Sequence, residues 1–106
     1  MNQQIFEQIR QLKRQVLPNG RLILFGSQAR GDERKDSDWD LLVVLNKPAR
    51  ETDDYDIYVY PFAEMGWKYG VYLSTKIFTV MEWEKQRPSP FYKNVEIGRA
   101  SCRERV

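Results

Sequence analysis

The chain has 106 residues, of which 42% are hydrophobic and 13% aromatic, and this composition is typical of one folded domain with a modest core. Its formal net charge is only +2, which indicates no large nucleic-acid footprint. No apolar run is long enough to span a membrane, and the first residues lack the pattern of a secretory signal, so we expect a cytoplasmic protein without membrane contact.

The first half of the chain predicts one helix and two strands. Apolar residues recur at helical spacing over 2–17, and a Pro-Asn-Gly turn follows. Residues 21–25 and 39–45 are nearly continuous apolar runs, as is typical of buried strands. Between them we expect a short helix over 28–31 and a solvated loop over 32–37.

The second half predicts helices around a further strand. Acidic residues at the start of 51–69 favour a first helical turn there, and Pro61 should kink or divide this helix. Alternating β-prone residues predict a strand over 71–80, which a brief helix over 81–86 follows, and another helix begins within 89–95. The expected fold class is therefore α+β, with a small mixed β-sheet and helices mainly on one face.

The junction of the first two strands carries a motif with chemical meaning. The strand over 21–25 ends in Gly26-Ser27, and the next strand starts around Asp38 and Asp40. Side chains two apart on a strand point to the same face, so both carboxylates can converge on one point. Carboxylates suit hard cations such as Mg²⁺, while backbone N–H groups and the Ser27 hydroxyl suit phosphates. The motif indicates nucleotide chemistry, and its alternative is an ordinary hairpin with an acidic loop.

This motif resembles the minimal nucleotidyltransferase domain of the DNA polymerase β superfamily, over residues 1 to about 95. The residues that carry the resemblance are Gly26, Ser27, Ala29, Arg30, Gly31, Ser37, Asp38, Asp40 and the run 41–44. The resemblance implies the polymerase β-type nucleotidyltransferase fold, with Mg²⁺ as the cofactor and a nucleoside triphosphate, most simply ATP, as a substrate.

The candidate site residues have distinct roles. We expect Asp38 and Asp40 to be the catalytic metal ligands, and Gly26 and Ser27 to contact the phosphates. Arg30 and Ser37 are further candidates for nucleotide binding. Their alternatives are structural: Arg30 can form an ion pair with the acidic loop, and Ser37 can cap that loop or orient Asp38.

One expected residue is missing. Enzymes that this chain resembles carry a third acid on a later strand, where it helps to bind the catalytic metal and to activate the nucleophile. The matching residues 70–77 contain no acid, and Tyr72 or Ser74 takes that position. Neither is a charged metal ligand at neutral pH, so we expect nucleotide binding with at most slow transfer. Glu64 is the first candidate for a substitute acid.

The resemblance implies two possible functions. One is Mg²⁺-dependent transfer of a nucleoside monophosphate, most simply AMP, to a protein hydroxyl. The other is a catalytically weak nucleotide-binding module that acts by contact with a partner. Free-standing domains of this family often occur beside a helical HEPN protein in toxin–antitoxin pairs, so the resemblance implies an antitoxin with a HEPN-type partner in both cases. The many tyrosines and tryptophans between residues 55 and 92 either stack a base, form an interface or are partly buried.

The C-terminal residues 97–106, with the sequence IGRASCRERV, resemble the translation of a common sequencing-library adapter. The acidic and basic residues of 1–96 balance, so the positive net charge comes from this segment. The chain has no histidine, and its one cysteine, Cys102, also lies here, so residues 1–96 contain no zinc site of Cys and His and no Cys or His catalyst. We interpret 1–96 as the nucleotidyltransferase domain and 97–106 as a non-native tail. The alternative is a genuine basic tail for an acidic partner.

Overall fold

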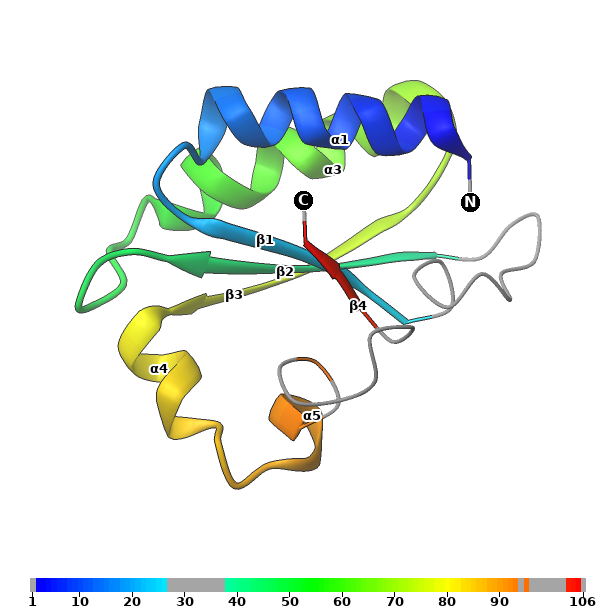
Figure 1. Cartoon of the computed structure of the whole chain (residues 1–106). Helices are drawn as coiled ribbons and strands as arrows, with labels where there is room; N and C mark the ends of the chain where they lie inside the picture. The colour runs from blue at the N-terminus through cyan, green and yellow to red at the C-terminus, as the bar shows by residue number, and fades with distance from the viewer. Residues whose placement is uncertain (1, 27–37, 94, 96–102, 106) are drawn as a thin grey trace.

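A computed structural model of the chain describes residues 2–26, 38–93, 95 and 103–105 (Figure 1). In chain order the elements are α1 (Gln3–Val16), β1 (Arg21–Phe25), β2 (Trp39–Leu45), the π-helix η1 (Tyr55–Val59), α3 (Tyr60–Tyr69), β3 (Leu73–Thr79), α4 (Val80–Lys85), α5 (Pro90–Tyr92) and β4 (Arg103–Arg105). The helix predicted over 28–31 and the loop predicted over 32–37 lie outside the described residues. None of the helices in the described ranges has the length and apolar character that crossing a membrane requires.

The sheet has the strand order β3-β2-β1-β4, with β2 inside it. β2 pairs antiparallel with β1 and parallel with β3, so the sheet is mixed. Both β1 and β2 have the predicted boundaries, because their apolar runs are bounded by turn residues and charges. The predicted fold class, α+β with a small mixed sheet, is confirmed.

Two cores lie on opposite faces of the sheet (Figure 1). The longer helices α1 and α3 cover one face, and the short helices α4 and α5 pack on the other. The first core consists of Ile5, Phe6, Ile9, Leu17, Leu22, Leu24, Trp39, Leu41, Val43, Leu45, Phe62 and Leu73. The second consists of Ile23, Leu42, Val44, Trp83, Tyr92 and Val95. Successive residues of β1 and β2 alternate between the two cores, as the pleat of a strand requires.

The expected helix over 51–69 is divided near Pro61, as the sequence predicts. A π-helix, η1, runs up to Val59, and α3 starts at Tyr60 with the proline in its first turn. Proline is tolerated there because the first N–H groups of a helix have no partner within the helix. At the other end, Gly70 has a φ of +71° and ends α3, so β3 starts at Leu73 rather than at the predicted residue 71.

A buried carboxylate ties the end of β2 to η1. Asp54 is 3% exposed, and its carboxylate accepts hydrogen bonds from Lys47 Nζ at 2.5 Å and from the Glu51 N–H at 2.6 Å. Burial acts to raise the pKa of Asp54, but these hydrogen bonds outweigh it and hold the pKa below its ordinary value of 3.8. Asp54 therefore stabilises the fold in its ionised form.

β4 is an element that the sequence does not predict. It lies within the segment interpreted as a non-native tail, and its three residues pair antiparallel with Ile23, Leu24 and Phe25 of β1. β1 would otherwise be an edge strand among the described residues, with unpaired backbone groups along its outer side. Such an edge accepts an added strand through backbone hydrogen bonds alone, which explains the pairing without any apolar pattern in residues 97–106.

We expect Asp54→Asn to lower the melting temperature at neutral pH, because the amide leaves Lys47 without its buried counter-charge. Since the folded-state pKa of Asp54 is depressed, its contribution is complete above the unfolded value of 3.8 and is lost as the pH falls through the lower folded value. The difference in melting temperature between parent and variant should therefore shrink below pH 3.8. Asp53→Asn, at the exposed neighbouring position, is the matched control and should show no such difference.

We expect deletion of residues 97–106 to lower the melting temperature by less than ~4 °C, about 1 kcal/mol for a domain of this size. On deletion, the three paired residues of β1 replace their hydrogen bonds to β4 by hydrogen bonds to water, at a small net cost in free energy. Thermal unfolding followed by circular dichroism measures the effect. A larger drop would show that this segment is a docked part of the fold.

Candidate active site

Three strands meet at one end of the sheet. β1 ends at Phe25 where β2 begins, because these two strands are antiparallel, and β3 begins at the same end, because it is parallel to β2 (Figure 1). The register pairs Asp40 with Phe25 on one side and with Ser74 on the other. Asp40 therefore lies in the middle of a row that runs across all three strands.

The carboxylate of Asp40 lies directly against the backbone of Gly26. Gly26 has a φ of +77°, and a Cβ placed on it would collide with Oδ2 of Asp40 and lie 3.1 Å from its Cγ. Glycine is required here for two independent reasons, a left-handed backbone and the absence of room for any side chain. The predicted pair of Gly26 and Asp40 is thus brought into contact, with the acid held at the point where β1 ends.

Asp38 lies next to the start of the same strand. Trp39 is 2% exposed and belongs to the first core, and its N–H donates to the Tyr72 carbonyl at 3.0 Å. The alternation of the strand therefore places Asp40 on the opposite face, and Asp38 precedes Trp39 by one residue and is exposed. Both predicted carboxylates thus stand at the same strand end, one partly buried and one open to solvent.

The remaining predicted site residues are not described. Ser27, Arg30 and Ser37 lie in the segment 27–37, outside the described residues, so their expected contacts with phosphates stay predictions. Among the residues that are described, no group of three or more His, Cys, Asp or Glu side chains is placed to hold a metal ion. The described carboxylates at this strand end are those of Asp38 and Asp40. This set fits Mg²⁺, which is commonly bound by one or two carboxylates together with substrate phosphates.

The register of β3 shows which residue stands beside Asp40. Ser74 is the residue of β3 that pairs with Asp40, and β3 itself, Leu73–Thr79, contains no acid. Of the two predicted candidates, Ser74 therefore stands beside Asp40, while Tyr72 precedes the strand and is 61% exposed. A serine hydroxyl at this position is neutral, so it adds no negative charge beside the two carboxylates.

Three other acids among the described residues lie away from this row or are engaged elsewhere. Glu64, the first candidate for a substitute, lines a surface hollow between α1 and α3, on the face of the sheet opposite to Asp40. Glu82 accepts a hydrogen bond from the Thr79 N–H and pairs with Arg50 at 3.1 Å. The Thr79 N–H holds the pKa of Glu82 below its usual value, as expected for a carboxylate in a capping box. Asp54 is bound to Lys47.

The tyrosines and tryptophans between residues 55 and 92 differ in burial, and Tyr58 and Tyr69 are half-buried against the first core. Trp83 and Tyr92 are buried in the second core, with their ring centroids 4.8 Å apart. Four others are exposed on η1, on α3 and just before β3, and these are Tyr55, Tyr60, Trp67 and Tyr72. The sequence predicts that some aromatic residues lie on the surface but gives no indication of which ones, because the burial depends on how α3 packs against β3.

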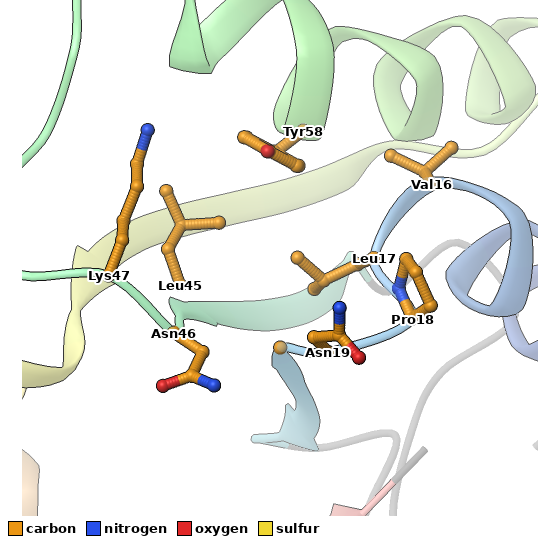
Figure 2. A pocket seen from close by; sticks show the side chains of 9 residues that line it. Val16, Leu17, Pro18, Asn19, Leu45, Asn46, Lys47 and Tyr58 are labelled. Carbon is orange, nitrogen blue, oxygen red and sulfur yellow. The ribbon is translucent and has the colours of Figure 1, made fainter.

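A separate pocket of about 230 Å³ lies at the other end of the sheet (Figure 2). It is formed where α1 turns into β1 and where β2 ends, with Leu17, Leu45 and Tyr58 among its lining side chains. Lys47 at its rim is engaged by Glu51 and Asp54, and its Nζ lies 5.8 Å from the centre of the Tyr58 ring. This pocket is remote from Asp40 and contains no residue of the predicted site.

A family model of the nucleotidyltransferase domain matches residues 4–96 of the chain. The fold, the Gly26 turn and the paired carboxylates at the start of β2 agree with that match. The protein therefore belongs to the nucleotidyltransferase domain family of the polymerase β type. Comparison with curated proteins and with solved structures gives no match.

We expect Gly26→Ala to displace the Asp40 carboxylate and to abolish Mg²⁺-dependent nucleotide binding. Gly70→Ala is the matched control, because Gly70 also has a positive φ but has nothing within 4 Å of an added Cβ. Both variants share the cost of a left-handed backbone, roughly 1–2 kcal/mol. Thermal unfolding and nucleotide titration should show a larger stability loss for Gly26→Ala and a binding defect in that variant alone. Equal effects in both variants would contradict the contact.

Proposed function

We propose that the protein is a Mg²⁺-dependent nucleotidyltransferase that moves a nucleoside monophosphate, AMP from ATP, to a hydroxyl group of a partner protein. One observation carries this proposal. In a domain of the nucleotidyltransferase family, the Asp40 carboxylate is held against the backbone of Gly26, at the turn where a triphosphate would lie. A site of this kind places a metal-binding acid beside a stretch of backbone that phosphates can approach closely.

The chemistry requires little from the protein beyond positioning and charge. The acceptor oxygen forms a bond to the α-phosphorus, the bond from this phosphorus to the oxygen that bridges to the β-phosphorus breaks, and pyrophosphate leaves. When bound, Mg²⁺ would neutralise the charge of the triphosphate. Asp38 and Asp40 would hold the triphosphate through that charge, and Gly26 allows the phosphates to approach the backbone. The acceptor proton passes to solvent, because Ser74 is not a base at neutral pH.

A second candidate function is favoured by β3. Its lack of an acid beside Asp40 favours slow transfer, and a domain that binds MgATP and transfers slowly can act on a partner by contact alone. In both cases we propose a HEPN-type protein of a toxin–antitoxin pair as the partner, on the basis of the resemblance in sequence. Incubation with labelled ATP, Mg²⁺ and such a partner separates the two: label on the partner supports transfer, and a stable complex without label supports contact.

We expect Asp38→Asn and Asp40→Asn each to weaken MgATP binding at least ~10-fold, about 1.4 kcal/mol, without unfolding the domain. Each change removes one carboxylate from the proposed metal site and leaves the triphosphate charge uncompensated. Asp56→Asn, on the exposed side of η1, is the control. Calorimetric titration measures the affinity. If either site variant bound MgATP like the parent, the proposed metal site would be wrong.

We expect Ser74→Asp to raise the rate of AMP transfer, because it introduces an acid at the position that pairs with Asp40. Tyr72→Asp introduces the same charge two residues earlier, before the strand begins, and should raise the rate less. The measurement is label transfer to the partner per unit time at saturating MgATP. Rapid transfer by the unchanged protein, with no gain from Ser74→Asp, would show that another residue supplies the third acid.

A further inference from the structure

A surface hollow of about 310 Å³ lies beside the start of β3. Its lining comes from η1 and α3 on one side and from residues 71–75 on the other. The lining residues are Tyr55, Val59, Ala63, Trp67, Val71, Tyr72, Leu73, Ser74 and Thr75. The volume is within the range that small ligands fill in proteins, roughly 300–1,000 Å³.

The chemistry of this hollow suits a flat, uncharged ligand. None of its lining residues carries a charge, and its three aromatic side chains are unusually exposed: Tyr55 by 56%, Trp67 by 67% and Tyr72 by 61%. The Trp67 ring also packs edge-to-face with Tyr60, whose ring centroid lies 5.8 Å away. An exposed indole offers a face on which another ring can stack.

Polar groups stand at the margin of the same hollow. β3 is the outermost strand on its side of the described sheet, so its outer backbone groups have no further strand to pair with there. The Trp39 N–H donates to the Tyr72 carbonyl, which places the backbone of Tyr72 towards β2 and that of Leu73 towards the outer side. The hydroxyls of Ser74 and Thr75 add further donors and acceptors. A ring with its own hydrogen-bond donors and acceptors can therefore form hydrogen bonds with this edge of β3.

The hollow and the proposed active site share one residue. Ser74 lines the hollow and is also the partner of Asp40 in the parallel ladder. Neighbouring strands are about 4.8 Å apart, so Ser74, at the edge of the hollow, lies one strand away from the carboxylate that would hold the phosphates. A nucleotide is long enough to have its phosphates at Asp40 and its ring beyond Ser74.

We propose that this hollow binds the nucleobase of the nucleoside triphosphate, with the base stacked on Trp67 between Tyr55 and Tyr72. The inference rests on the proposed function, because it uses Asp38 and Asp40 as the phosphate end of the same ligand. It assigns the exposed aromatic residues to base recognition, and it makes Trp67 a binding residue that lies outside the sequence motif.

The test uses the intrinsic fluorescence of tryptophan. Trp39 and Trp83 are each 2% exposed, so Trp67 is the tryptophan from which added ligands and acrylamide can quench emission at the surface. Adenosine without metal should quench this emission and should protect it from acrylamide. Trp67→Ala should weaken MgATP binding ~10-fold, as expected for the loss of one stacked base, and should leave binding of magnesium tripolyphosphate unchanged.

Matched variants separate this inference from the proposed function. Asp40→Asn should lose tripolyphosphate binding and keep adenosine quenching, whereas Met81→Ala, an exposed apolar residue on α4, should change neither. Adenosine quenching in a parent that does not bind tripolyphosphate would support the base site and contradict the proposed function. The base site is wrong if adenosine and MgATP leave Trp67 emission unchanged, or if Trp67→Ala binds MgATP like the parent. The base site is also wrong if Trp67 emission responds to a partner protein but not to adenosine or MgATP.

Discussion

A carboxylate packed against a glycine is the contact on which the rest of the site depends. Asp40 can occupy its place only because Gly26 has no side chain, and Gly26 can adopt its backbone conformation only because it is glycine. The two residues are brought together by the antiparallel pairing of β1 with β2, and Ser74 is brought beside them by the parallel pairing of β2 with β3. The site is thus a property of strand register, which two separate cores hold in place.

The division of the core explains why so small a domain can hold a polar site at a strand end. On one face, Leu41 and Val43 pack beneath α1 and α3, and on the other, Leu42 and Val44 pack against Trp83. Each fully buried side chain of this size contributes roughly 1.5–3 kcal/mol, so β2 is anchored along most of its length. The cost of partly burying Asp40, the second residue of β2, is offset by this anchoring.

The elements that were predictable are those whose signal is local. The apolar runs gave the bounds of β1 and β2, Pro61 predicted the division between η1 and α3, and the Gly26 and Asp40 motif predicted a shared site. The choice of Ser74 over Tyr72 beside Asp40 required the register of β3, which depends on where Gly70 ends α3. β4 was not predictable, because its pairing uses backbone groups alone. The hollow at Trp67 is lined by residues from three segments, and no spacing in the sequence predicts that these residues lie together.

The position of β2 inside the sheet also bears on how the protein loses its structure. Strands that are paired on both sides and covered on both faces release their amide protons only when the whole domain opens, whereas edges and short helices open earlier. β2 meets all of these conditions, and it carries Asp40. We therefore expect the amides of β2 to be among the last to exchange with solvent, and the carboxylate on this strand to keep its place when other parts of the domain open. By the same argument, we expect Asp40 to leave its register only when the domain unfolds globally.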